Sequence, residues 1–336
     1  MVRPPHIRDV AALAGVGVGT VSRVLNDSAG VADDTRERVR AAMDDLGYRP
    51  SNAARRLSLG RTQTLGVIAP FFTHPSVVER VRGIDDVVGD SAYDLVLFNV
   101  ETSGQAEDAL RRFARADRVD GVLVVSLPLS DDELTALQDQ GIPVALVDVD
   151  DERLPHVSND DVLGGTLAAR HLLDAGHRRV AFVGDTVENP FGFTSSARRL
   201  EGFAAAMEEA GAPLAPECIR RGPHGREVAG LLARELLDLG EPPTAIFAAS
   251  DVQAFGVLDA AARAGLDVPG GVSVIGFDDI DLAGAIGLTT VRQPLRESGR
   301  AGARLLLAAL AGDGHEDAPA LPELLVAARR TVGAPP

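Results

Sequence analysis

The feature that most constrains the fold is an alternation of short apolar segments with longer segments of helical periodicity, which runs from Leu65 to Phe277. Apolar segments without a polar alternation are typical of strands buried on both faces. Strands separated by helices pair in parallel, because each helix returns the chain to the same end of the sheet. The sequence therefore predicts an α/β protein with doubly wound parallel sheets.

The alternation falls into two series, which predict two lobes. In the first, strands are expected at 65–69, 93–99, 121–126 and 144–147, and helices at 76–89, 104–116 and 131–140. In the second, strands are expected at 180–184, 244–248 and 272–277, with a weak one near Cys218, and helices at 165–175, 198–211, 226–240 and 252–265. Residues 288–294 are expected to cross back to the first lobe and to carry helix 297–311, and a strand at 323–327 is expected to return to the second. Ligands of such folds bind at the carboxyl ends of the strands.

Residues 7–26 follow a different pattern. Ile7, Val10, Ala11 and Ala14 have the spacing of one helix face, and a glycine turn at 15–17 interrupts it. A second helix is expected from Val18, with its outer face formed by small and polar residues: Gly19, Thr20, Ser22, Arg23 and Asn26. This pattern predicts a helix-turn-helix whose second helix can enter a DNA major groove. The same glycines resemble a phosphate-binding loop, but that loop requires a preceding strand.

A third helix is expected over residues 31–47, because acidic residues fill its start and Gly47 suits its end. The predicted domains are a helix-turn-helix headpiece at 1–49, a hinge or linker at 50–61 and an effector-binding and dimerisation domain at 62–336. Within the last, lobe one is about 62–161 plus 293–322, and lobe two is about 162–292 plus 323–336.

The charge is distributed unevenly along the 336 residues. Residues 1–61 contain 10 Arg and 7 Asp or Glu, whereas the remainder contains 23 Arg and 42 Asp or Glu, and the whole chain has a net charge of −16. Because an acidic body repels DNA, we expect DNA contact to be confined to the head. The sequence has no membrane span, no secretory signal and one cysteine, so we expect a cytoplasmic, nucleoid-associated protein that binds no membrane.

The head resembles the lactose-repressor/galactose-repressor (LacI/GalR) family of bacterial transcription factors. The matching residues lie at fixed spacings: Ile7, 9–11, 14–16, 20–26, Thr35-Arg36, 46–50, Leu57 and 60–62. The resemblance implies that Val18, Gly19 and Arg23 read bases and that Thr20, Ser22 and Asn26 contact phosphates. It also implies a hinge helix that forms on the operator, with Leu57 wedged into the minor groove beside Ala54.

The body resembles the effector domain of the same family, which has the fold of periplasmic sugar-binding proteins. The specific motifs are 176–179, 199–203, Ser250-Asp251, 276–279 and 288–294. The resemblance implies ligand binding by Arg199 and Asp278, with Ser250, Asp251, Asp160, Gln293 and His224 in the same crevice. Structural roles are the alternatives: an inter-helix salt bridge for Arg199, a helix cap for Asp278 or Asp251, and a turn residue for His177.

The loop at 70–77, PFFTHPSV, departs from the family pattern because paired aromatic residues that stack on a ligand ring are replaced by Ser76 and Val77. Phe72 or His74 could take over this stacking. The Arg–Asp pair in a polar cleft favours a sugar or small polyol as effector.

No catalytic motif is present: we find no nucleophile elbow, no metal-spaced His/Cys cluster and no phosphate loop in context, so no enzyme activity and no cofactor are expected. The predicted function is a ligand-responsive repressor of carbohydrate-utilisation genes. It would bind near-palindromic operator DNA as a homodimer and be released by a sugar-like effector. A corepressor-dependent regulator with a non-sugar ligand is the first alternative, and a solute-binding protein without a regulatory role is the second.

Overall fold

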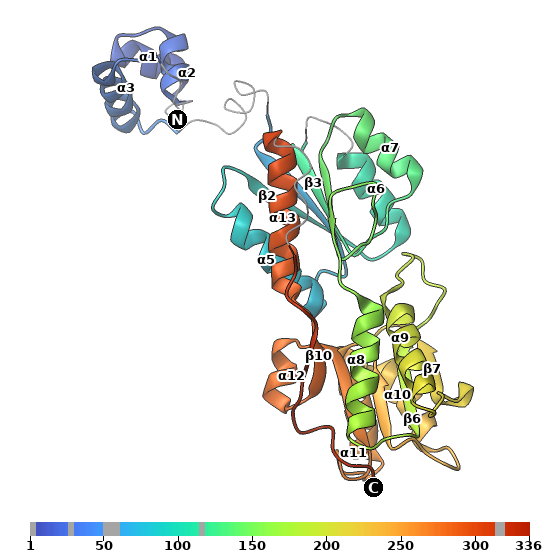
Figure 1. The fold of residues 1–336 in the computed structure, drawn as a ribbon. Coiled ribbons are helices and arrows are strands. Elements are labelled where there is room, and N and C mark those ends of the chain that lie inside the picture. The colour runs from blue at the N-terminus through green and yellow to red at the C-terminus, as the bar shows by residue number, and fades with distance from the viewer. Residues whose placement is uncertain (1–4, 26–29, 50–60, 114–117, 313–319) are drawn as a thin grey trace.

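The computed structural model describes residues 5–25, 30–49, 61–113, 118–312 and 320–336, which form a helical head followed by two α/β lobes (Figure 1). The head contains α1 (Ile7–Ala14), α2 (Val18–Leu25) and α3 (Asp33–Asp45). Its core includes Val10, Val21 and Val39, which are fully buried. Gly15, with a φ of 65°, ends α1, which is why a glycine is needed in this turn. The three predicted helices are confirmed.

Lobe one contains a five-stranded parallel sheet in the order β2-β1-β3-β4-β5. Its strands are β1 (Thr64–Pro70), β2 (Asp94–Val100), β3 (Gly121–Val125), β4 (Val144–Val147) and β5 (His156–Val157). Helices α5 (Pro75–Val88), α6 (Ser103–Phe113), α7 (Asp131–Asp139) and α13 (Leu295–Ala311) belong to this lobe. The central strands β1, β3 and β4 are buried along their whole length, as the apolar segments predicted, whereas β2 is a partly exposed edge.

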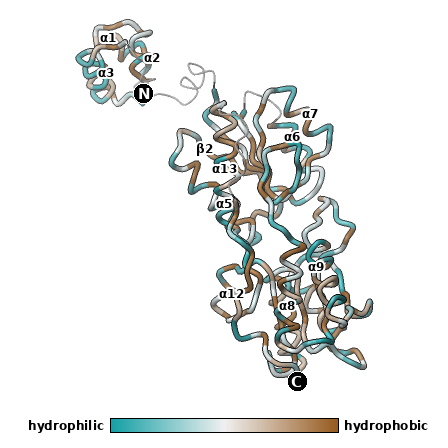
Figure 2. The backbone as a smooth tube through the Cα atoms, in the orientation of Figure 1, coloured by the Kyte–Doolittle hydropathy of each residue, from teal (hydrophilic) through white to brown (hydrophobic). Residues whose placement is uncertain are grey.

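Lobe two contains a six-stranded sheet in the order β11-β10-β9-β8-β6-β7. Its strands are β6 (Val180–Asp185), β7 (Ile219–Gly222), β8 (Ala245–Ala248), β9 (Ser273–Asp278), β10 (Thr289–Arg292) and β11 (Leu325–Ala327), of which only β11 is antiparallel. Its helices are α8 (Asp161–Asp174), α9 (Ser195–Glu209), α10 (Arg226–Leu237), α11 (Asp251–Arg263) and α12 (Asp281–Ile286). Hydrophobic residues follow the strands at the centre of each lobe (Figure 2).

The chain passes between the lobes at 157–161, at 292–295 and again between α13 and β11, where residues 313–319 lie outside the described part. Helix α13 packs against α5 and the β3–β5 side of the lobe-one sheet, and β11 pairs with β10 in the lobe-two sheet. Asp86 on α5 fixes α13, because it accepts hydrogen bonds from Arg296 and Arg300. No helix in the described part of the chain is long and apolar enough to cross a membrane.

Three differences from the predicted elements have local causes. Helix α8 begins at Asp161 instead of residue 165, because the Asp160 carboxylate accepts a hydrogen bond from the Leu163 N–H at 2.9 Å and caps the helix. Strand β5 has two residues and α12 has six, and both are too short for a periodic pattern to predict.

Candidate functional site

A cavity of about 560 Å³ lies between the lobes at the carboxyl ends of their strands, and this volume is typical of small-molecule sites. Phe71 follows β1, Asp148 follows β4, Asp185 ends β6 and Asp278 ends β9, and all four side chains line the cavity. Asp148 and Asp278 have positive φ values of 64° and 119°, which are unusual for residues with side chains and cluster at functional sites.

Arg199 enters the cavity from α9 and is 7% exposed. Its Nε donates to Asp161 on α8 at 2.8 Å, its Nη1 donates to the Ala249 carbonyl at 2.6 Å, and its guanidinium lies 3.7 Å from the centre of the Phe277 ring. Burial acts to lower the pKa of Arg199, but the charges of Asp161 and Asp278 raise it overall. Arg199 therefore has both of the features expected as alternatives: it forms the inter-helix salt bridge, and it lines the cavity.

Arg80 on α5 is the corresponding group in lobe one, and the sequence analysis did not identify it. It is 2% exposed, and its Nη2 lies 2.6 Å from Asp148. Asp148 also accepts a hydrogen bond from Ser126 Oγ at 2.7 Å. Each lobe therefore contributes one buried arginine that is already paired with a carboxylate.

Gln293 joins the two halves of the cavity at the second crossing of the chain. Its Oε1 accepts hydrogen bonds from Arg80 at 3.3 Å and from Asn159 at 3.0 Å, and its Nε2 donates to Asp278 at 2.6 Å. These bonds form a continuous polar chain from Asp148 in lobe one to Asp278 in lobe two. Gln293 therefore connects the polar groups of the two lobes directly.

Two buried carboxylates lie in lobe two, at Asp251, which begins α11, and at Asp278, which ends β9. Asp251 accepts hydrogen bonds from the Ile280 N–H at 2.9 Å and from Thr290 Oγ1 at 2.6 Å, so its contacts are structural. Burial raises the pKa of Asp278, and burial and then the charge of Asp278 raise the pKa of Asp251 well above its ordinary range. Asp278 does not cap a helix, because Ile280 is the residue before α12.

Aromatic rings form one wall of the cavity. Phe71 stacks on His74 at 5.0 Å and meets Phe191 edge-on at 5.5 Å, and Phe191 stacks on Phe193 at 5.2 Å. Phe71 has a φ of 44°, which turns its side chain into the cavity, whereas the neighbouring Phe72 is 40% exposed. Phe71, which the sequence analysis did not name, therefore lies in the cavity wall beside the predicted His74, and the predicted Phe72 does not.

The structure brings together most of the predicted ligand-binding residues. His74, Arg199, His224, Ser250, Asp278 and Gln293 line the cavity, and Phe72, Asp160 and Asp251 do not. Asp160 is exposed at the start of α8, and Asp251 lies in the core behind Asp278. His177 is a buried structural residue that contacts Thr244, Ser273 and the Gly333 carbonyl.

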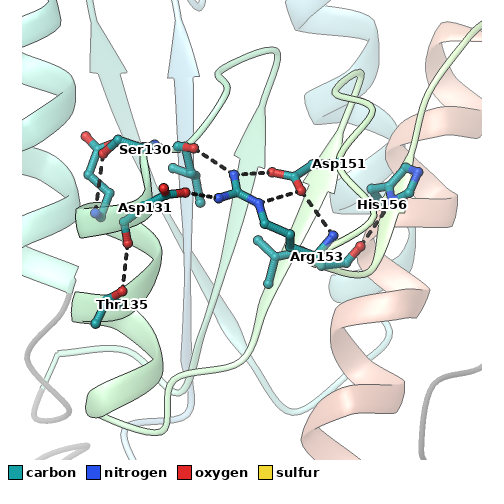
Figure 3. A network of polar contacts seen from close by, with 9 residues as sticks. Ser130, Asp131, Thr135, Asp151, Arg153 and His156 are labelled. Carbon is teal, nitrogen blue, oxygen red and sulfur yellow. Dashed lines mark hydrogen bonds and ion pairs between the residues drawn. The ribbon is translucent and has the colours of Figure 1, made fainter.

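The loop after β4 positions Asp148 and is fixed by Arg153 (Figure 3). The Arg153 guanidinium donates to Asp151 at 2.6 and 2.8 Å, to Asp131 at the start of α7 and to the Leu129 carbonyl at 3.0 Å. The hydrogen bond from Arg153 lowers the pKa of Asp151. In the described part of the chain, no three His, Cys, Asp or Glu side chains are grouped to hold a metal ion.

The head presents a second candidate site on α2. Val18, Gly19 and Arg23 are exposed on this helix, Thr20 and Ser22 are half-buried, and Val21 and Val24 face the core. The exposed face therefore contains the predicted base-reading residues. Asn26, Ala54 and Leu57 lie outside the described residues.

Comparisons with known proteins match both parts of the chain. Residues 6–51 match the family model for bacterial regulatory proteins of the lacI family, and residues 169–332 match that for a periplasmic binding protein-like domain. The HTH-type transcriptional repressor PurR of Photobacterium profundum is 33% identical over 92% of this chain and 93% of its own length. The transcriptional regulator CelR of Thermobifida fusca is 34% identical over 94% of both chains.

Two solved structures extend the likeness to the whole chain. The lac repressor dimer bound to operator and the anti-inducer ONPF has a TM-score of 0.86 at 27% identity, covering 99% of this chain and 100% of that one. The complex of the transcriptional regulator CelR with cellobiose has a TM-score of 0.72 at 31% identity, covering 98% and 100%.

Proposed function

We propose that this protein, which belongs to the lacI family of bacterial regulatory proteins, represses carbohydrate-utilisation genes and releases its operator when a small sugar-like effector binds. Family membership makes it a DNA-binding transcriptional regulator and not an enzyme. The observation that carries the proposal is the presence, on one chain, of an exposed recognition-helix face and an inter-lobe cavity of small-molecule size. We place the protein in the cytoplasm, on the nucleoid.

For DNA binding we propose a homodimer on a near-palindromic operator, with the two α2 helices in successive major grooves. The solved dimer of the lac repressor on its operator supports this arrangement. Arg23 is the one exposed arginine of α2, and its guanidinium suits guanine O6 and N7. Val18 and Gly19 beside it are small, so specificity would draw also on Leu57 of the hinge.

For the effector we propose a neutral, hydroxyl-rich molecule. Both arginines of the cavity are already paired with carboxylates, which reduces their attraction for an anionic ligand. Five carboxylates line the cavity, at Glu101, Asp148, Asp185, Glu188 and Asp278, and they suit hydroxyl donors. The wall that contains Phe71 and Phe193 would bind one flat apolar face. Binding would favour one arrangement of the lobes over another and so shift the hinge.

The test is a fluorescence-anisotropy titration of the full chain on its own upstream DNA, with cellobiose, ribose and purine bases as probes. We expect sequence-specific binding that one sugar releases. Arg23→Ala should weaken specific binding by about 10- to 100-fold, because one bidentate base contact is lost. Arg8→Ala, which removes an exposed arginine from α1, is the charge-matched control and should weaken specific and non-specific binding alike. Absence of any sequence-specific binding, with or without probes, would refute the proposal.

A pair of neighbouring carboxylates separates effector binding from general damage. Asp278→Asn should abolish the response to the sugar and retain operator binding, because Asp278 lines the cavity. Asp251→Asn, at a buried carboxylate outside the cavity, should retain both. Strengthened operator binding with a purine base would favour the corepressor alternative, for which the aromatic wall provides a stacking surface.

A further inference from the structure

Two histidines meet across the cavity between the lobes. His74 precedes α5 in lobe one, and His224 lies between β7 and α10 in lobe two. Their ring centroids are 5.2 Å apart with planes tilted by 36°. Beside them, Phe71 of lobe one meets Phe191 of lobe two at 5.5 Å. The lobes are therefore joined on this side by two ring-to-ring contacts, one of which can change its charge.

The surroundings of the two imidazoles differ. The Nδ1 atom of His224 lies 3.1 Å from the Asp185 carboxylate, and its side chain is 31% exposed. His74 stacks instead on the apolar ring of Phe71 at 5.0 Å with planes 16° apart. The other charged side chains that line the same cavity are Arg80, Glu101, Asp148, Glu188, Arg199 and Asp278.

These surroundings move the two pKa values in opposite directions. Burial, and then the charge of His224, lowers the pKa of His74, although Asp185 acts the other way. Burial also acts to lower the pKa of His224, but the hydrogen bond to Asp185 and the charges of Asp185 and Asp278 raise it overall against the effect of Arg199. His224 is therefore the more basic of the two imidazoles, and His74 is the less basic.

We propose that the contact between His74 and His224 is a latch that holds the two lobes closed while one of the two imidazoles is protonated, and that opens when both are. In the singly protonated state the His224 cation lies against a neutral ring and remains paired with Asp185. In the doubly protonated state two cations face each other at the distance of the present contact, which is unfavourable in a partly desolvated cleft.

The pH dependence has two limbs. Because the pKa of His74 is lowered, its contribution to closure is complete above the ordinary value of about 6.5 and is lost as pH falls through the lowered pKa. Because the pKa of His224 is raised, its contribution is complete below about 6.5 and is lost as pH rises through the raised pKa. Closure is therefore greatest between the lowered pKa of His74 and the raised pKa of His224, and it decreases on both sides. If the proposed function holds, the response of operator binding to effector should also depend on pH. The latch itself does not rest on the proposed function.

The test uses the full chain without DNA or effector. The sequence contains no Trp, so Phe193→Trp, beside Phe191 in the cavity wall, introduces a single tryptophan whose emission can be selected. Its emission is measured from pH 5 to pH 8, and the radius of gyration is measured by small-angle scattering at the same pH values. We expect a bell-shaped profile of closure. His74→Phe, which keeps an aromatic ring that cannot be protonated, should abolish the acid limb and retain the alkaline one. His224→Phe, which removes the cation that both limbs require, should abolish both.

His171→Gln is the matched control. His171 on α8 is also a half-buried histidine whose pKa is lowered by burial, but it does not line the cavity. Both limbs should persist in this variant. A flat profile in the reporter protein, or limbs that survive both Phe variants, would overturn the latch. Because no DNA or effector is present, that outcome leaves the proposed repressor function intact, and a failure to bind the operator likewise leaves the latch intact.

Discussion

The two lobes place an arginine in the cavity by the same device. In lobe one, α5 crosses α13 so closely that a Cβ on Gly83 would lie 1.9 Å from the Arg296 carbonyl oxygen, and one on Gly299 would lie 1.9 Å from that of Arg80. In lobe two, α8 crosses α9 equally closely. A Cβ on Gly165 would lie 1.9 Å from the Arg199 carbonyl oxygen, and one on Gly202 would lie 1.8 Å from that of Val162. The backbone of each cavity arginine is thus fixed at a glycine contact.

The lobes differ in where the crossing helices come from and in how well the arginine is paired. Helices α8 and α9 are consecutive, whereas α5 and α13 stand at opposite ends of the effector body. Arg199 has a carboxylate, a carbonyl and an aromatic ring as partners, but the Nε of Arg80 is buried without one among the described residues. In lobe two the helices that hold the arginine are neighbours in the sequence and its Nε is paired. In lobe one the helices come from distant parts of the chain and the Nε is buried without a partner in the described part of the chain.

The largest expected effect comes from removing these arginines. Arg199→Met should lower the free energy of unfolding by about 3–5 kcal/mol, because it leaves the Asp161 carboxylate unpaired in the interior. Arg80→Met should lower the free energy of unfolding by less, about 3 kcal/mol, since the Nε of Arg80 is already buried without a partner among the described residues. Urea denaturation measures both. The doubles Arg199→Met/Asp161→Asn and Arg80→Met/Asp148→Asn should recover most of the loss, and equal stabilities of single and double variants would disprove the pairing argument.

A smaller effect is expected at the glycine crossings. Gly202→Ala and Gly83→Ala place a methyl group against a backbone carbonyl, which costs about 1–3 kcal/mol. The higher helix propensity of Ala offsets about 1 kcal/mol of this. Gly104→Ala in α6, where nothing lies within 4 Å of the added atom, is the matched control and should not lose stability. If Gly83→Ala behaves like this control while Gly202→Ala does not, the crossing of distant helices in lobe one can relax and that of consecutive helices cannot.

The smallest effect on stability is expected at the edges of the sheets. Val96 and Leu97 on β2 are each 39% exposed on the edge strand of lobe one, a feature that invites pairing with a second copy. Leu97→Lys should change the free energy of unfolding of the monomer by no more than about 0.5 kcal/mol. In sedimentation velocity the same variant should be a monomer, whereas the unsubstituted protein should be the proposed dimer. Leu325→Lys on β11, the edge of lobe two, is the control and should remain dimeric. Dissociation by Leu325→Lys alone would assign the interface to the other lobe.

The periodicity of the sequence predicted the order of the elements because the strands at 64–70, 121–125 and 144–147 are buried on both faces and the longer helices show one apolar stripe. Arg80 could not be predicted, since an arginine on a helix is ordinarily exposed. Its burial depends on Asp148, which is far along the chain and is brought near only by the sheet.

Family resemblance identified Arg199, Asp278 and Gln293, which lie in the cavity, but also Asp160 and Asp251, which do not. Asp251 follows the cavity residue Ser250, but its carboxylate accepts hydrogen bonds in the core, and the carboxylate of Asp160 caps α8. Phe71 was missed because its inward orientation depends on a positive φ that no pattern of residue types reveals. The orientation of side chains around the cavity is therefore less readable from sequence than the order of the helices and strands.

The three passages of the chain between the lobes limit how such a protein can be recombined. A hybrid that joins lobe one of this chain to lobe two of a relative needs junctions near 157–161, near 292–295 and again between α13 and β11. A single splice after residue 161 would pair α5 with a foreign α13, whose glycine and carbonyl positions would have to match. An exchange of whole lobes between relatives therefore needs three matched junctions, whereas a substitution at a cavity residue needs none.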